Sequence, residues 1–351
     1  MTSRMEQLLA AAGERILVLD GAMGTVIQSL GLEEDDYRNG QVKGNNKDLK
    51  GNQDILNLTA PDKIRYIHEQ YLKAGADIIE TNTFNGTSIS QSEYATEALA
   101  YDINFEGAKL AREAADKIAT KARPRFVAGA LGPTNKTLSV SPKVSDPSFR
   151  AVTFQAVKDS YKEAARGLLE GGADFLLVET IFDTLNAKAA IVAAEELKQE
   201  LKTDIPLALS LTVTDLSGRT LSGQTVEAFW YSVRHARPFS VGLNCAFGAQ
   251  DLRPFVAELS RAADTLICAY PNAGLPNELG EYTETPDMTA SELSEWAKSG
   301  FLNIVGGCCG TTPDHISTIA EHVGKFPPRE IPHHGPALRL AGLEPMTVAS
   351  E

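Results

Sequence analysis

The chain has 351 residues, of which 43% are hydrophobic and 23% are charged, and its formal net charge is −13. These proportions are typical of a soluble globular protein. The negative charge argues against binding to nucleic acid or to an anionic membrane, because both favour basic patches. The N-terminus has no apolar leader, no run approaches the roughly 18 apolar residues of a membrane span, and four cysteines make no disulfide framework. We therefore expect a cytoplasmic protein with reduced thiols.

Eight apolar segments alternate with amphipathic helical patterns along the chain. Each segment is a nearly continuous apolar run, as expected of parallel strands that are buried on both faces. The predicted strands span residues 15–20, 76–82, 125–132, 175–181, 206–213, 240–246, 266–272 and 301–307. Strands that alternate with helices in this way predict an α/β fold, a (β/α)8 TIM barrel with eight parallel strands and outer helices.

The segment between the first two strands shows the helical pattern clearly. In "TAPDKIRYIHEQYLKAG", Thr59 fits an N-cap, Pro61 fits the first turn and Gly75 fits the end of the helix. The junctions "KAGADIIE", "EGGADFLLVE" and "KSGFLNIV" resemble one another, which indicates a repeated βα unit. An open doubly wound sheet is the alternative fold, but no Gly-x-Gly-x-x-Gly follows the first strand to support it.

Two regions depart from this alternation. Residues 30–58 are polar and rich in Gly and Asn, which predicts a long loop after the first strand, on the face where barrel active sites lie. Prolines gather after residue 325, so residues 326–351 are expected to form an extended tail or linker. We therefore assign residues 1–325 to the barrel, and whether the chain is a fragment or a separate subunit stays open.

Three of the four cysteines fall at the C-terminal ends of predicted strands, where barrel active sites lie. Cys245 ends the sixth strand, and Cys308 and Cys309 follow the eighth. In a closed barrel one strand separates these ends, so three thiolates could bind one Zn²⁺ and leave a fourth position open. The neighbouring glycines would allow the backbone angles that turn adjacent cysteines toward one ion. Buried inert thiols are the alternative, and we expect one for Cys268, in the middle of a strand.

Carboxylates end two of the predicted strands, Asp20 the first and Glu179 the fourth. Burying a carboxylate is costly unless it faces a cleft, so each could bind a cation such as a substrate ammonium group. The alternative is that each accepts hydrogen bonds from neighbouring loops. The segment "DGAMGT" that begins at Asp20 offers successive backbone N–H groups, which could bind a carboxylate.

Eight distinctive strings follow one another along the chain from about Ile16 to His315: "ILVLDGAMGT", "GADIIETNTF", "GALGPTN", "FDTLNAKAA", "SGRTLSGQ", "GLNCA", "YPNAGLPN" and "NIVGGCCGTTPDHI". Together they resemble the homocysteine S-methyltransferase family. Within the family the chain is similar to the N-terminal homocysteine-binding domain of cobalamin-dependent methionine synthase. The strings "SGRTLSGQ" and "PNAGLPN" favour that branch over the betaine–homocysteine and S-methylmethionine–homocysteine methyltransferases.

The resemblance implies a (β/α)8 barrel that carries a zinc ion on Cys245, Cys308 and Cys309. These cysteines would also be the catalytic centre, since the ion binds homocysteine sulfur as a thiolate for methyl transfer. Asn272 matches the asparagine whose oxygen can hold the fourth position when no substrate is bound.

The resemblance also implies the substrate contacts and the partners. Asp20 and Glu179 match positions associated with the substrate amino group, and the loop from Gly21 to Thr25 lies near the amino-acid moiety. Methylcobalamin would be the methyl donor, and the cobalamin- and folate-binding parts of a methionine synthase would be other domains or subunits. Betaine or S-methylmethionine as donor is one alternative. A homocysteine-binding module that needs a separate cobalamin module for turnover is another.

Overall fold

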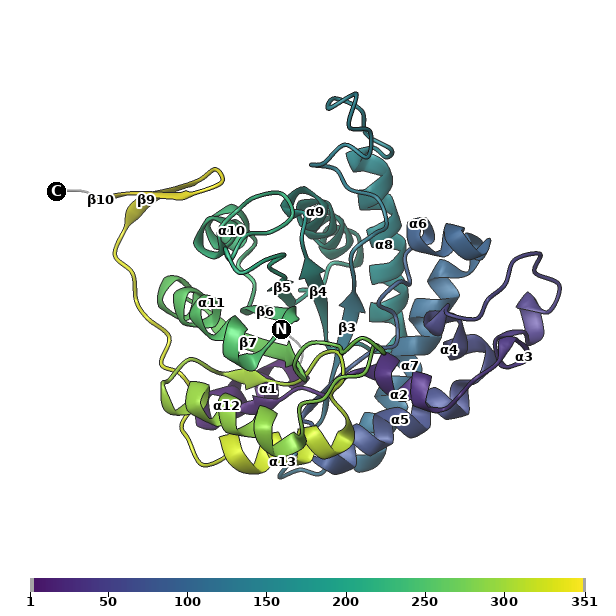
Figure 1. The fold of residues 1–351 in the computed structure, drawn as a ribbon, viewed down its shortest axis with the longest axis horizontal. Coiled ribbons are helices and arrows are strands. Elements are labelled where there is room, and N and C mark those ends of the chain that lie inside the picture. The colour runs from purple at the N-terminus through teal and green to yellow at the C-terminus, as the bar shows by residue number, and fades with distance from the viewer. Residues whose placement is uncertain (1–2, 350–351) are drawn as a thin grey trace.

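The structure, a computed structural model, describes residues 3–349 of the chain (Figure 1). Eight strands form one sheet in the order β1-β8-β7-β6-β5-β4-β3-β2, and all neighbouring strands are parallel. The strands are β1 (Leu17–Val18), β2 (Ile78–Glu80), β3 (Phe126–Leu131), β4 (Phe175–Ile181), β5 (Leu207–Leu211), β6 (Ser240–Gly248), β7 (Leu266–Asn272) and β8 (Ile304–Val305). A parallel bridge between Leu19 and Ile78 joins the two ends of this order. The sheet is therefore a nearly closed barrel.

This closure confirms the predicted (β/α)8 barrel and shows that the doubly wound alternative is wrong. Each predicted strand segment overlaps one strand of the sheet, and only β6 runs further than predicted, to Gly248. Helices surround the barrel (Figure 1). They are α1 (Ser3–Glu14), α2 (Met23–Ser29), α3 (Glu34–Tyr37), α4 (Leu56–Thr59), α5 (Pro61–Ala74), α6 (Ser88–Gln91), α7 (Ala100–Ile118), α8 (Phe154–Gly171), α9 (Thr184–Leu201), α10 (Val226–Val233), α11 (Ala249–Ala262), α12 (Pro286–Lys298) and α13 (Pro313–Val323).

The helix α5 shows how the local sequence sets these boundaries. Pro61 lies in its first turn, and the helix ends at Gly75, whose φ of 116° is left-handed and suits glycine. The predicted N-cap is wrong by one residue, because Ala60 caps α5 while Thr59 is the last residue of α4.

Side chains of successive strand residues alternate between two apolar layers. In β1, Val18 packs outward against the helices, whereas Leu17 packs inside the barrel. Met5 and Leu8 of α1 belong to the same interior cluster as Leu17. The helix α1 therefore covers the N-terminal end of the barrel, which leaves the C-terminal strand ends for a site.

The two irregular regions contain more structure than a loop and a tail. Residues 30–58 include α3, α4 and the short 3₁₀ helices η1 (Gly40–Val42) and η2 (Gln53–Ile55). Residues 337–349 form an antiparallel hairpin of β9 (Ala337–Ala341) and β10 (Pro345–Ala349), which lies beside α10 in Figure 1. The Thr225 N–H donates to the Leu343 carbonyl at 3.0 Å, which holds the turn of this hairpin on the barrel.

Within residues 3–349, none of the helices combines the length and the apolar character that a membrane span requires.

Candidate functional site

Three thiols meet at the C-terminal end of the barrel. Cys245 lies in β6, and Cys308 and Cys309 follow β8. Their Sγ atoms all lie within 4.8 Å of one another, and the Sγ atoms of Cys245 and Cys309 are 3.8 Å apart. Tetrahedral zinc with Zn–S bonds of about 2.3 Å spaces its sulfur ligands about 3.8 Å apart. The donor set and its spacing therefore fit zinc.

The backbone beside these thiols adopts unusual dihedral angles. Cys245 and Ala246 have φ values of 60° and 65°, in the left-handed region that non-glycine residues rarely adopt. Gly310 also has a positive φ, 82°, as its predicted role requires. Gly307 does not, and its role is space instead, because a Cβ there would lie 2.4 Å from the Thr311 side chain.

Without a metal, the three sulfurs share charge unequally. Hydrogen bonds from the Cys245 and Cys308 thiols lower the pKa of Cys309 to about 3. The pKa of Cys308 is raised well above its ordinary value by its hydrogen bonds with the Cys245 and Cys309 sulfurs. The cluster thus holds a thiolate at neutral pH, which is the form that binds metal. Cys268 lies apart from it, buried in the barrel interior as predicted.

Asn272 ends β7, between the strands that carry the thiols. Main-chain hydrogen bonds join this strand end to the cysteine turn, from the Cys308 N–H to the Pro271 carbonyl (2.8 Å) and from the Ala273 N–H to the Cys309 carbonyl (2.9 Å). Asn272 is 4% exposed, and its Oδ1 has no hydrogen-bond partner. Buried amide oxygens are nearly always paired, so this oxygen is available to a ligand.

Three carboxylates lie at or just after the C-terminal ends of β1, β2 and β4. Asp20 and Glu179 are buried, at 2% and 4% exposed, whereas Glu80 at the end of β2 is only partly buried. Asp20 Oδ2 accepts the Glu80 N–H at 3.1 Å, while Asp20 Oδ1 and Glu80 Oε1 have no partner. Glu179 Oε2 accepts only a long hydrogen bond, 3.5 Å, from the Tyr270 hydroxyl. None of the three carboxylates forms an ion pair with a residue in the described part of the chain.

The electrostatics of these carboxylates follow from burial without a cation. Burial raises the pKa of Glu179 to about 8. Burial raises the pKa of Asp20 and of Glu80 well above their ordinary values, and repulsion from Glu179 adds to both. A bound cation would remove this penalty. Sequence reasoning did not single out Glu80, although its position at a strand end in "ADIIETN" was the same indication that identified Asp20 and Glu179.

The segment from Gly21 to Thr25 lies against the cysteine turn. The Gly310 N–H donates to Thr25 Oγ1 at 3.0 Å, and a Cβ on Gly21 would lie 2.8 Å from Thr311 Oγ1. The Ala22 N–H already donates to the Thr311 carbonyl at 3.1 Å. Any carboxylate bound here would have to use the other N–H groups of this segment.

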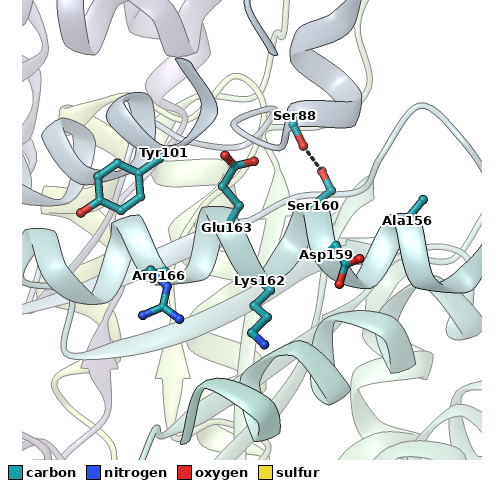
Figure 2. A pocket seen from close by; sticks show the side chains of 8 residues that line it. All are labelled: Ser88, Tyr101, Ala156, Asp159, Ser160, Lys162, Glu163 and Arg166. Carbon is teal, nitrogen blue, oxygen red and sulfur yellow. Dashed lines mark hydrogen bonds between the residues drawn. The ribbon is translucent and has the colours of Figure 1, made fainter. Parts of the chain in front are cut away.

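A cavity lies elsewhere, on the outer surface between α6, α7 and α8 (Figure 2). Its volume is about 570 Å³, and Ser88 and Ser160 share a hydrogen bond of 2.8 Å across it. Its cations are already paired, since Lys162 contacts Glu196 and Glu200 and Arg166 contacts Glu200. Because its two cations are paired, this cavity offers no free positive charge to a ligand, and it does not mark the site.

Comparison with known proteins supports the barrel fold and shows the family. Crystal structures of the homocysteine methyltransferase MmuM from Escherichia coli match the fold. The oxidized form has a TM-score of 0.70 at 22% identity over 91% of this chain and 99% of that one. The metallated form has a TM-score of 0.68 at 22% identity, over 90% and 99% of the two chains. The profile of the family described as homocysteine S-methyltransferase matches residues 17–323, and the chain therefore belongs to the homocysteine S-methyltransferase family.

Proposed function

We propose that this chain carries out the zinc-dependent activation of homocysteine as a thiolate for methyl transfer from methylcobalamin, forming methionine. The observation that carries the proposal is the meeting of the Cys245, Cys308 and Cys309 thiols within 4.8 Å at the open end of a barrel of this family. When bound, zinc would lower the pKa of the homocysteine thiol, which is about 8.5 for a free thiol, and so provide the nucleophile at neutral pH.

In this proposal, different residues of the site bind the sulfur end and the ammonium end of the substrate. Cys245, Cys308 and Cys309 hold the ion and keep the sulfur end electron-rich through their negative charge. The unpaired Oδ1 of Asn272 supports its role as the group that holds the fourth position until substrate enters. Entry of the substrate sulfur would then displace a neutral oxygen rather than a thiolate.

The carboxylates are proposed to bind the ammonium group of homocysteine. Asp20 and Glu179 were predicted for this role, and Glu80 is added because its buried Oε1 is also unpaired. An ammonium group offers three N–H donors and one positive charge, which suits three acceptors that lack a cation. The Gly21–Thr25 segment, next to the cysteine turn, is proposed to lie along the amino-acid moiety.

The methyl donor is the finer part of the proposal. Methylcobalamin is favoured by the strings "SGRTLSGQ" and "PNAGLPN", with cobalamin- and folate-binding domains or subunits as partners in the cytoplasm. Betaine or S-methylmethionine would be the donor in a related enzyme of the same class. The barrel matches 99% of the E. coli chain, so that enzyme has this fold over nearly its full length.

Metal analysis and a donor comparison test the proposal. We expect the wild type to contain zinc and to methylate homocysteine with methylcobalamin, and to do so poorly with betaine or S-methylmethionine. Cys308→Ala should lose both zinc and transfer, and Cys268→Ala, a buried thiol outside the cluster, is the matched control. Retention of zinc and transfer by Cys308→Ala would refute the catalytic proposal. A wild type that binds zinc and homocysteine but forms no methionine with any donor would identify a binding module instead.

A further inference from the structure

Asn244, directly before Cys245, is completely buried, and its side-chain amide contacts residues of several strands. Its Oδ1 accepts hydrogen bonds from the Ser210 hydroxyl (2.7 Å) and from the Thr180 N–H (3.1 Å). Its Nδ2 donates to Thr180 Oγ1 at 2.8 Å and lies 4.0 Å from Cys308 Sγ. One side chain from β6 therefore contacts β4, β5 and the turn after β8.

Both strands that the amide joins depart from regular pairing at the point of contact. Thr180 has a φ of 52°, which is strained for a β-branched residue, and the pairing of β4 with β5 shifts register between Val178 and Ile181. The pairing of β6 with β7 shifts register between Asn244 and Gly248. The Asn244 amide satisfies both the N–H and the hydroxyl of Thr180, so it helps to hold the strained residue in place.

The contact matters because of what lies next to each of its ends. Thr180 follows Glu179, which is proposed to bind the substrate ammonium group, and Asn244 precedes Cys245, which is proposed to bind zinc. The strand β5 separates β4 from β6 in the sheet, so no main-chain ladder ties these two strand ends directly. The amide is therefore a direct side-chain link between the ammonium end and the sulfur end of the site.

We infer that Asn244 is a positioning residue that fixes the distance between these two ends and thereby selects an amino thiol of the length of homocysteine. The inference rests on the proposed function. Homocysteine has one more methylene than cysteine between its sulfur and the carbon that bears its ammonium group. If the distance between the two ends is fixed to suit homocysteine, the shorter cysteine would lose either its sulfur contact or its ammonium contact. A site whose ends move independently loses this discrimination, because small displacements of binding groups are costly only where the geometry is fixed.

The test measures the affinities of the zinc-loaded full chain for L-homocysteine and L-cysteine by calorimetry. The variants are Asn244→Ala, which removes the link, and Thr180→Val, which keeps the side-chain volume but removes the hydroxyl that accepts from Nδ2. We expect the preference of the wild type for homocysteine to fall by about tenfold in Asn244→Ala and by less in Thr180→Val. Zinc content should stay at the wild-type value.

A matched control separates this role from ordinary buried packing. Asn186 is also buried, and its amide contacts Thr134 Oγ1 (3.0 Å), the Lys136 carbonyl (2.8 Å) and the Leu138 N–H (3.0 Å), but it does not join the two ends of the site. We expect Asn186→Ala to lower stability and to leave the preference for homocysteine unchanged.

The outcomes distinguish failure of this inference from failure of the proposed function. If Asn244→Ala keeps its zinc and the wild-type preference, the inference is overturned alone. If Asn244→Ala does not fold or loses zinc, Thr180→Val decides, and an unchanged preference in that variant overturns the inference. A wild type that binds neither zinc nor homocysteine would overturn the proposed function and the inference with it.

Discussion

The two ends of the barrel both bury carboxylates, but they treat them in opposite ways. At the N-terminal end, Asp77 is completely buried just before β2. Arg15 donates two hydrogen bonds to it, at 2.7 and 2.8 Å, and Arg123 and the Val18 N–H donate others at 3.2 and 3.0 Å. Burial by itself would raise the pKa of Asp77, but Arg15 holds it below its ordinary value. This carboxylate has all its partners within the chain.

At the C-terminal end, Asp20, Glu80 and Glu179 have no such cation among the residues that the structure describes, and their pKa values are raised instead. A protein that can pair a buried carboxylate with arginine at one end has not done so at the other. We propose that the first end serves stability and that a ligand completes the second, in line with the position of active sites in barrels of this class. Substitutions at the two ends should therefore separate stability from binding.

The largest expected effect is at the thiols of the open end. Cys309→Ala should reduce bound zinc and methyl transfer to undetectable values, because two thiols and a neutral oxygen hold the ion poorly. Elemental analysis and a homocysteine methylation assay measure both. The free energy of unfolding of the metal-free protein should change little. A variant that keeps its zinc would show that the cluster is not the metal site.

The next effect is at the closed end. Asp77→Asn should lower the free energy of unfolding by about 2 kcal/mol, below the 3–5 kcal/mol typical of a fully buried pair, because Arg15 and Arg123 are partly exposed. Urea unfolding measures this change. Homocysteine affinity of the folded protein should stay the same. A loss of affinity at constant stability would contradict the division between the two ends.

The matched substitution at the open end should do the reverse. Glu179→Gln is expected to weaken homocysteine binding by about tenfold, since it removes a charged acceptor from the ammonium group. Its stability in the absence of substrate should equal or exceed that of the wild type, because a buried unpaired carboxylate is costly. Calorimetry and urea unfolding give the two values. Destabilisation on the scale of Asp77→Asn would mean that Glu179 is a structural group.

The last expected effect is a pH dependence of stability whose sign differs between Asp54 and Asp77. Asp54 in η2 is buried and forms no ion pair within residues 3–349, and burial raises its pKa to about 7 from an ordinary value of 3.8. A carboxyl group with a raised folded pKa stabilises the folded state only below that pKa. The contribution of Asp54 to the stability of the folded state is therefore lost as the pH rises from about 4 to about 7. Asp77, whose pKa is lowered, contributes above its ordinary value of 3.8 and loses that contribution on acidification.

Unfolding of Asp54→Asn and the wild type across this pH range tests the sign. The stability of the variant relative to the wild type should rise between about pH 4 and pH 7, by up to about 4 kcal/mol for the full shift in pKa. For Asp77→Asn the deficit should shrink as the pH falls below about 4. If the stabilities of the two variants relative to the wild type changed with pH in the same direction, the predicted difference in sign would be contradicted.

Much of this architecture could be predicted from the sequence, because its indications are local. Continuous apolar runs gave the strand positions, and strand ends gave Cys245, Cys308 and Cys309, which the structure brings together. Glu80 and Asn244 could have been found by the same reasoning. A buried strand that carries an asparagine, as in "GLNCA", must pair that amide with something.

Other features depend on contacts that are distant in sequence. The hydrogen bonds between Asn244 and Thr180 join residues 64 positions apart, and no pattern in either strand predicts this pairing. The hairpin of β9 and β10 is a different case. Apolar residues recur at every second position in its two strands, at Leu338 and Leu340 and at Met346 and Val348. This pattern indicates strands, but the prolines before it favoured the prediction of a tail.

The central claim is that three cysteines hold zinc and leave one position for the sulfur of homocysteine. X-ray absorption at the zinc edge, recorded with and without homocysteine, tests it most directly. The account predicts three sulfur ligands and one lighter ligand without substrate, and a fourth sulfur in place of the lighter ligand when homocysteine is added. A sulfur count that does not change on adding homocysteine would contradict it.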